Sequence, residues 1–580
     1  MNPPHNKRYQ LWPQMVVLFA IFFLAQSIIL WNTTWGWFDH SDWGSFKKHY
    51  PFILTIFGKY IPFVEFQKWL IYWNNLGVAN LRTEFILHLT LPIIFSFVTS
   101  FLFVRQLLWV EGGRERVIHI KGPLLLEGNR AERHARASHQ RDLKANLSSK
   151  KGIYIHPKIS LCTQREQASF GIVGATGGGK STVFKPLVSQ AISRGDYAII
   201  YDEKGEYTSS FYNSDTTHLI AAWDERSACW NIFLDVGTKH QAELLALCLI
   251  PDRGGKDAIW FTGARMLFVG MILVLLSYKK PWGWKALSNM LSTPQDQMLE
   301  LLNIHHPIAA SFIKKESVTT QGFYVNLTGE LSWIEDLAIA WPRPVKGGFS
   351  VKKWVSGNDP KKVIIIQSDP RFDSIGAPLC NAIVSLITRN FLALEENIER
   401  KTWLFIDEFA NLPRNPMIKK WLELARSRGA RSVICTQSIS QIREIYGAND
   451  TDTILNLLSN IISLRIGSGG DEAKYISRIF GERIVERPNS SDANATWVRT
   501  REQLVEDFEL TQLKPASNKG VEGYLFVPGW QATYKLVWPI YKANSVAKRH
   551  CPAKWIEAIA PKENTKSPQT NRLNKRGIQC

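Results

Sequence analysis

The nine residues from Gly174 to Thr182 constrain the fold of this 580-residue chain more than any other feature. They read Gly-Ala-Thr-Gly-Gly-Gly-Lys-Ser-Thr and match the pattern GxxxxGK[ST]. The short apolar run 170–173 precedes them, as expected for a strand that leads through a loop into a helix. Such a loop curls its backbone amides around phosphate groups. We therefore predict a P-loop nucleotide-binding domain.

The chemistry of a triphosphate site assigns a role to each part of this loop. The glycines let the backbone approach the phosphates, Lys180 places a positive charge on them, and the Ser181 hydroxyl takes one position on Mg²⁺. The predicted cofactors are ATP and Mg²⁺. The predicted nucleotide-binding residues are Gly174, Ala175, Thr176, Gly177, Gly178, Gly179, Lys180, Ser181 and Thr182.

A P-loop needs a second strand that ends in a carboxylate, and Trp403-Leu-Phe-Ile followed by Asp407 and Glu408 fits a Walker B motif. We expect Asp407 to hold Mg²⁺ through water and Glu408 to polarise the attacking water, as in-line phosphoryl transfer requires. The alternative is an ordinary strand that ends in a solvated acidic turn.

Three further apolar runs end in polar residues, at 197–201, 363–366 and 431–435. In an open α/β sheet, ligands bind beyond the carboxyl ends of the strands. We therefore expect Asp202, Lys204 and Gln437 to converge with the Walker acids on the phosphates. Gln437 is a candidate sensor of the γ-phosphate, although a glutamine at a strand end is usually a turn residue.

Lys180 and Asp407 are 227 residues apart, too many for a compact RecA-like core. The excess is helical in pattern, with helices expected at 241–250, 258–278, 294–302 and 327–340. The apolar run 266–276 is too short to cross a membrane and fits a buried helix. The predicted fold class is α/β, a RecA-like P-loop NTPase with a mostly parallel sheet (111–236 and 346–545) and an all-α insertion (237–345).

The charge of the chain restricts its partners. Its net charge of +19 favours polyanions such as nucleic acid or anionic lipid, although a basic surface without such a partner is also possible. The seven cysteines form no CxxC or Cys/His cluster, which argues against a zinc site or a disulfide scaffold and favours a reducing compartment.

Two apolar runs near the N-terminus predict a membrane anchor over 1–110. Residues 9–38 contain no Asp, Glu, Lys, Arg or His, and residues 85–104 contain only one histidine among these types. We predict transmembrane helices at about 14–32 and 85–104, since about 20 apolar residues span a bilayer. A cleavable signal peptide is the alternative for the first run, but no small-residue cleavage site follows it.

The distribution of charge orients this hairpin. Eleven Lys and Arg against five acids occupy 105–151, which places both termini in the cytoplasm. The periplasmic loop 33–84 is rich in aromatic residues, which suits contact with either lipid or protein. At the other end of the chain, we expect the basic segment 546–580 to be a disordered tail.

Taken together, these features resemble the type IV coupling proteins of bacterial conjugation and secretion, and their TraD-like members in particular. The resemblance covers most of the chain. It rests on the apolar hairpin, the P-loop, the Asp202-Glu-Lys-Gly-Glu206 turn, the helical insertion from Asp257-Ala-Ile-Trp260, the Walker acids, and the segments 425–429 and 435–438. The basic tail departs from the long acidic extension of many relatives.

The resemblance implies a HerA/FtsK-type homohexameric ATPase, a multi-pass protein of the bacterial inner membrane. It implies as partners DNA, a relaxase or relaxosome, and type IV secretion channel proteins, with ATP hydrolysis driving DNA translocation. Delivery of protein effectors to a type IV secretion system is the alternative function. A membrane platform that uses nucleotide as a switch is disfavoured, because a switch has no need of the catalytic carboxylate Glu408.

The resemblance also places an arginine finger in the turn Ala425-Arg-Ser-Arg-Gly429. Arg426 is 11 residues before Gln437, a spacing that favours it over Arg428. We expect its guanidinium to reach the γ-phosphate bound by the neighbouring subunit. A surface arginine, free or paired with Glu423, is the alternative, with Arg428 or Arg465 as other candidate fingers.

Overall fold

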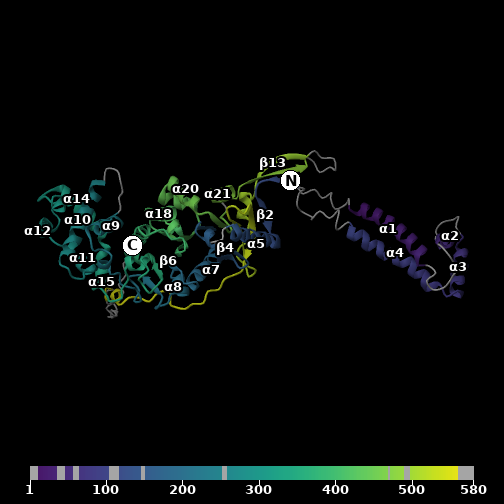
Figure 1. Ribbon diagram of the computed structural model, residues 1–580, viewed down its shortest axis with the longest axis horizontal. Coiled ribbons are helices and arrows are strands. Elements are labelled where there is room, and N and C mark those ends of the chain that lie inside the picture. Colours follow the sequence, from purple (N-terminus) through teal and green to yellow (C-terminus); the bar gives the residue numbers. More distant parts are fainter. Residues whose placement is uncertain are drawn as a thin grey trace, which may run out of the picture. The chain divides into compact units, whose positions relative to one another are not determined.

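The computed structural model describes residues 11–34, 46–56, 65–103, 117–145, 150–250, 258–467, 471–488 and 497–559. The chain divides into two compact units (Figure 1). The first spans 1–120 and 485–500, and the second spans 121–484 and 501–580.

Two long apolar helices, α1 (Leu11–Thr33) and α4 (Arg82–Phe103), lie side by side in the first unit (Figure 1). Both are long and apolar enough to cross a membrane. Gln26 joins them: its Oε1 accepts a hydrogen bond from Ser96 Oγ at 2.9 Å, and its Nε2 donates to Thr99 Oγ1 at 3.2 Å. In an apolar environment such bonds satisfy polar groups that lipid cannot.

Two shorter helices, α2 (Phe46–Thr55) and α3 (Phe66–Val78), fall in the segment expected to be an aromatic loop. Part of that segment folds against α1 and α4 through a buried cluster of Trp31, Tyr72, Leu76, Leu81 and Phe85. The tryptophans at 35, 37 and 43 lie outside the described residues. A three-stranded sheet has the order β1 (Ile118–Lys121), β12 (Glu482–Pro488), β13 (Trp497–Gln503).

The second unit is built on a ten-stranded sheet with the order β2-β15-β14-β11-β5-β10-β9-β6-β8-β7. The seven strands from β11 to β7 are parallel, β14 is antiparallel to both of its neighbours, and β2 is parallel to β15. The strands are β2 (Leu124–Glu127), β5 (Phe170–Val173), β6 (Tyr197–Asp202), β7 (Thr217–Ile220), β8 (Val363–Gln367), β9 (Thr402–Ile406), β10 (Ala430–Thr436), β11 (Asn460–Ser463), β14 (Val521–Phe526) and β15 (Ala532–Trp538).

The central strands are continuous apolar runs because helices cover both faces of a parallel sheet. Every residue of β5, β8, β9 and β10 is buried. The helices of this part are α5 (Gly128–Ala145), α6 (Thr163–Glu166), α7 (Lys180–Ser193), α8 (Glu206–Phe211), α17 (Asp373–Leu392), α18 (Pro416–Leu424), α19 (Ile439–Tyr446), α20 (Ala448–Leu457), α21 (Asp471–Phe480) and α22 (Asp507–Thr511). Short 3₁₀ turns are η5 (Ile232–Leu234), η7 (Pro370–Phe372), η8 (Phe409–Asn411) and η9 (Arg426–Arg428).

The segment between β7 and β8 is helical (Figure 1). It belongs to the same compact unit as the sheet, and α9 and α15 pack against α17. Its helices are α9 (Lys239–Leu249), α10 (Ala258–Ser277), α11 (Trp284–Leu291), α12 (Gln295–His305), α13 (Pro307–Ala310), α14 (Val318–Leu331), α15 (Trp333–Ala340) and α16 (Val351–Val355).

Two details of this segment differ from the sequence expectation. The helix expected at 327–340 is broken at Ser332 between α14 and α15, and α11 was not expected. The break directs Trp333 into the interior, where it is buried and packs 5.8 Å from the ring of Trp284. The most apolar helix of this segment, α10, is longer than the run expected at 266–276 and has the length and composition of a membrane span, but it is 61% buried, as a core helix would be.

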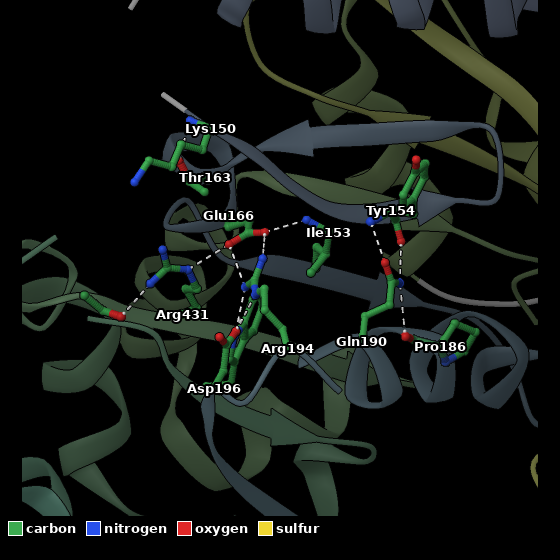
Figure 2. A network of polar contacts seen from close by, with 12 residues as sticks. Lys150, Ile153, Tyr154, Thr163, Glu166, Pro186, Gln190, Arg194, Asp196 and Arg431 are labelled. Atoms are coloured by element: carbon green, nitrogen blue, oxygen red, sulfur yellow. Dashed lines mark hydrogen bonds and ion pairs between the residues drawn. The ribbon is translucent and has the colours of Figure 1, made fainter. Parts of the chain in front are cut away.

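A buried ion network lies where α7 ends and β10 begins (Figure 2). Glu166 accepts hydrogen bonds from Arg194 at 2.9 and 3.1 Å, from Arg431 Nε at 3.0 Å, and from the backbone N–H of Ile153. Arg194 also donates to Asp196. One carboxylate therefore ties the hairpin β3 (Lys151–His156) and β4 (Ile159–Cys162) to the central sheet.

The C-terminal segment requires a correction. We expected disorder from residue 546, but residues 546–559 are ordered and include α23 (Lys554–Ile559). Backbone groups of this segment form hydrogen bonds with Ser209, Glu225 and Trp223, which a count of charges in the sequence does not reveal. Residues 560–580 lie outside the described residues.

Candidate active site

The P-loop connects β5 to α7, which begins at Lys180. Gly177 and Gly179 adopt φ angles of +73° and +91°, a region that side chains disfavour. A Cβ on Gly179 would also lie 2.5 Å from Val521 Cγ2. The loop is anchored at its start, because the N–H of Ala175 donates to Arg465 O at 2.8 Å. The backbone conformation of the loop therefore favours glycine at positions 177 and 179.

Lys180 and Glu408 meet in this site. Lys180 Nζ lies 3.2 Å from Glu408 Oε2 and 3.1 Å from Gly174 O. Both side chains are 10% exposed, so the pair is largely desolvated. Because β9 lies next to β10, which itself pairs with β5, the sheet carries the Walker B acids to the P-loop.

Gln437 follows β10 and is bonded to both motifs. Its backbone N–H donates to Glu408 Oε1 at 3.2 Å, and its side-chain Oε1 accepts a hydrogen bond from Thr176 Oγ1 in the P-loop. A side chain held between the P-loop and the Walker B glutamate is placed to respond to a bound phosphate.

Asp407 has the properties of a cation ligand. Its Oδ1 is buried without a hydrogen-bond partner among the described residues. Burial raises the pKa of its carboxyl, while the neighbouring Tyr207 hydroxyl and, to a smaller extent, the charge of Lys180 oppose that shift. A divalent cation would supply the missing partner, and the Ser181 hydroxyl lines the same cavity. These residues fit Mg²⁺ held between Asp407, Ser181 and phosphate oxygens.

The motifs line a cavity of about 270 Å³. The three residues expected at neighbouring strand ends, Asp202, Lys204 and Gln437, line it together with both Walker acids. The cavity is lined by Ala175, Thr176, Gly177, Gly179, Lys180, Ser181, Thr182, Tyr201, Asp202, Glu203, Lys204, Glu206, Tyr207, Asp407, Glu408, Asn411 and Gln437.

Several of these residues were not singled out from the sequence. Tyr207, in α8, is 2% exposed, and its hydroxyl has no hydrogen-bond partner among the described residues. Asn411 donates to Glu203 Oε2 at 2.7 Å and so closes one side of the cavity. A single tyrosine or asparagine belongs to no recognisable motif. Only the position of Asn411, four residues after Asp407, could have indicated that it lies near the site.

Asp202 has a structural as well as a lining role. It is fully buried, and its Oδ2 accepts hydrogen bonds from the backbone N–H of Thr208 at 2.7 Å and from Thr208 Oγ1 at 2.8 Å. Burial raises its pKa, and these hydrogen bonds oppose that shift. The carboxylate thus fixes the turn that carries Lys204 and Glu206.

Arg426 does not line the nucleotide cavity of its own chain. It lies in η9, before β10, whereas Gln437 follows the same strand. At about 3.3 Å per residue, a strand of this length separates the two by roughly 20 Å. Arg426 instead lines a separate cavity of about 610 Å³ together with Gln167, Glu423 and Arg428. Arg428 donates to Leu394 O at 2.9 Å, and Arg465 O accepts the N–H of Ala175 in the P-loop.

A mostly parallel sheet, a P-loop at the start of α7 and a Walker B pair at the end of β9, one strand removed from β5, define a P-loop NTPase fold. Residues 153–512 match the family model of the type IV secretion-system coupling protein DNA-binding domain. This match covers more than half of the chain, which therefore belongs to the type IV coupling protein family.

Individual relatives are distant. The chain is 25% identical over 307 residues to the coupling protein TraD of Escherichia coli, which covers 52% of this chain and 42% of TraD. It is 24% identical over 346 residues to a probable conjugal transfer protein TraG of Sinorhizobium fredii, covering 55% and 53%. The chain thus spans only about half the length of these relatives.

Solved structures show the same fold. An unbound form of the bacterial conjugative coupling protein TrwBdeltaN70 has a TM-score of 0.64 at 21% identity, and the match covers 76% of this chain and 98% of that one. The complex of plasmid coupling protein TrwB with ADP and Mg²⁺ has a TM-score of 0.63 at 21% identity, covering 77% and 100%.

Proposed function

We propose that this protein is an inner-membrane ATPase that recruits a relaxase–DNA complex and moves DNA to a type IV secretion channel. The observation that carries the proposal is the contact between Lys180 and Glu408 in a cavity of suitable lining, within a segment that belongs to a DNA-binding coupling family. The net charge of +19 suits a polyanionic substrate.

The roles of the chain's own groups follow from the geometry. Bound ATP and Mg²⁺ supply the scissile phosphate and neutralise its developing charge. The P-loop amides and Lys180 hold the phosphates in place, while Asp407 and Ser181 face the cation. Glu408 is the group that orients and polarises a water, and the Lys180 ammonium lies beside it. The hydrogen bonds of Gln437 to Thr176 and Glu408 link the P-loop to the residue that polarises the water.

The proposed assembly is a homohexameric ring anchored by α1 and α4, with both termini in the cytoplasm. The support for a ring is the location of Arg426. Because it lies at the opposite end of β10 from the P-loop cavity, it could stabilise transition-state charge only in a neighbouring subunit. The polar contacts of Gln26 would then hold the two membrane helices together.

ATP hydrolysis by the full chain in detergent, with and without single- and double-stranded DNA, tests this function. We expect turnover that DNA stimulates and that chelation of Mg²⁺ abolishes. A rate of ATP hydrolysis that neither form of DNA changes would contradict a DNA translocase and favour delivery of protein effectors.

A further inference from the structure

The C-terminal segment 545–555, here named the strap, lies on the turn 202–206 that lines the nucleotide cavity. Its backbone contacts this turn closely: a Cβ on Gly205, whose φ is +67°, would lie 2.9 Å from Arg549 O and 3.0 Å from Arg549 Cβ. The helix that follows the turn, α8, is held as well, because Ser209 O accepts the N–H groups of Val546 at 2.8 Å and Ala547 at 3.2 Å.

A chain of hydrogen bonds runs from the strap to the cavity. Gln367 Nε2 donates to Arg549 O at 2.9 Å and to Thr208 Oγ1 at 2.7 Å. Thr208 Oγ1 in turn donates to Asp202 Oδ2 at 2.8 Å. Gln367, Thr208 and Asp202 are all buried, so the bonds among them are shielded from water, and the bond to Arg549 O is partly buried. Gln367 itself does not line the cavity.

A second buried cluster clamps the strap in place. Asp224 is 2% exposed and accepts hydrogen bonds from Arg226 Nη2 at 2.6 Å and from the N–H of Cys551 at 2.9 Å. Arg226 Nη1 donates to Lys548 O at 2.8 Å. Further along, Trp555 Nε1 donates to Ala222 O at 2.8 Å.

These contacts have a functional consequence. The turn 202–206 contributes Lys204 and Glu206 to the cavity, and Asp202 is its buried anchor. Without the strap, Gly205 would lose its packing partner and Gln367 Nε2 would lose one of its two hydrogen-bond acceptors. A buried polar group left without a partner is costly, so the turn would rearrange.

We propose that the strap is a positioning element of the nucleotide site, which holds the turn 202–206 in the form that binds ATP. This rests on the proposed function of the cavity. Gln367 transmits the position of the strap to Asp202 and Thr208, so it is a positioning residue and not a catalytic one. The C-terminal segment thereby sets the affinity of the site for nucleotide.

Two truncations of the full-length protein in detergent test this inference. A chain that ends at Ala543 lacks the strap, and a chain that ends at Ala560 keeps it and is the matched control. We expect loss of the strap to raise both the KM for ATP and the Kd for a fluorescent ATP analogue about tenfold, with kcat changed less than about twofold. The control should match the full chain. A synthetic peptide of residues 543–560 should restore the affinity of the shorter chain.

Gln367→Ala keeps the test decisive if the shorter chain does not fold. We expect this variant to raise the KM and the Kd about threefold, while Gln321→Ala, at an exposed position of α14, changes neither. A purely structural role would lower the active fraction, and so the apparent kcat, without moving the KM. Wild-type KM and Kd in Gln367→Ala, or in a folded chain ending at Ala543, would overturn the inference. A full chain that fails to bind the analogue would overturn the proposed function and this inference with it.

Discussion

Lys180 Nζ and Glu408 Oε2 lie 3.2 Å apart although 228 residues separate them in sequence. Each side chain is 10% exposed, and the contact places the residue proposed to bind phosphate beside the residue proposed to activate water. One ion pair therefore joins the residue proposed for phosphate binding to the residue proposed for hydrolysis. Substitutions on its two sides should have different effects.

Lys180→Ala should abolish ATP turnover, because it removes the charge that holds the phosphates and leaves Glu408 without its partner. Insertion into membranes should be unaffected, since α1 and α4 lie outside the P-loop domain. Phosphate release and membrane fractionation measure these two effects. Lys315→Ala, at a lysine that is 74% exposed, is the matched control and should be fully active. Wild-type turnover in Lys180→Ala would refute the site.

Glu408→Gln should retain ATP binding and trap an ATP-bound oligomer, since the amide can still fill the site but cannot polarise water. Hydrolysis and size-exclusion chromatography with ATP measure the outcome. Glu399→Gln, at an exposed glutamate, controls for the loss of one negative charge. Normal hydrolysis in Glu408→Gln would mean that another group acts as the base.

Glu166→Ala should destabilise the protein by about 3–5 kcal/mol, because it leaves the buried guanidinium of Arg431 without an ion-pair partner. Arg431 is 1% exposed and Glu166 is fully buried. Glu132→Ala, which removes a partly exposed partner of Lys158, should cost about 1 kcal/mol or less. Chemical denaturation measures the free energy of unfolding of the two variants. Equal stabilities would contradict the larger stabilising contribution expected from the Glu166 network.

Arg426→Ala and Lys180→Ala should each be inactive alone and partly active when mixed. In a mixed ring some interfaces combine an intact P-loop with an intact arginine, which can raise the rate of hydrolysis by a factor of order 10³–10⁵ where such fingers act. ATP hydrolysis over a series of mixing ratios measures the recovery. A failure to complement, in rings shown to be mixed, would exclude Arg426 and leave Arg428 or Arg465 as candidates.

The sequence predicts the central strands and the two Walker motifs well, for a physical reason. Runs such as 170–173 and 363–366 must be apolar throughout to be buried on both faces, and the glycines must be present where φ is positive. These requirements are local, so they appear as patterns of adjacent residues.

The parts that sequence reasoning missed depend on contacts between distant segments. The bond from Gln367 to Arg549 joins residues 182 positions apart and has no periodic signal. The strap as a whole has no periodic signal either. Its charges suggested disorder, but its backbone forms hydrogen bonds with distant parts of the second unit. The break at Ser332 accompanies the burial of Trp333, which the helical pattern alone does not indicate.

The most direct test of the account is the rate of ATP hydrolysis by the full chain with and without DNA, measured beside Lys180→Ala. The account predicts Mg²⁺-dependent turnover that rises on addition of DNA, falls back as salt screens the basic surface, and is absent in the variant. Turnover that survives in Lys180→Ala, or that DNA leaves unchanged at low salt, would contradict the assignment of this protein as a DNA-translocating coupling ATPase.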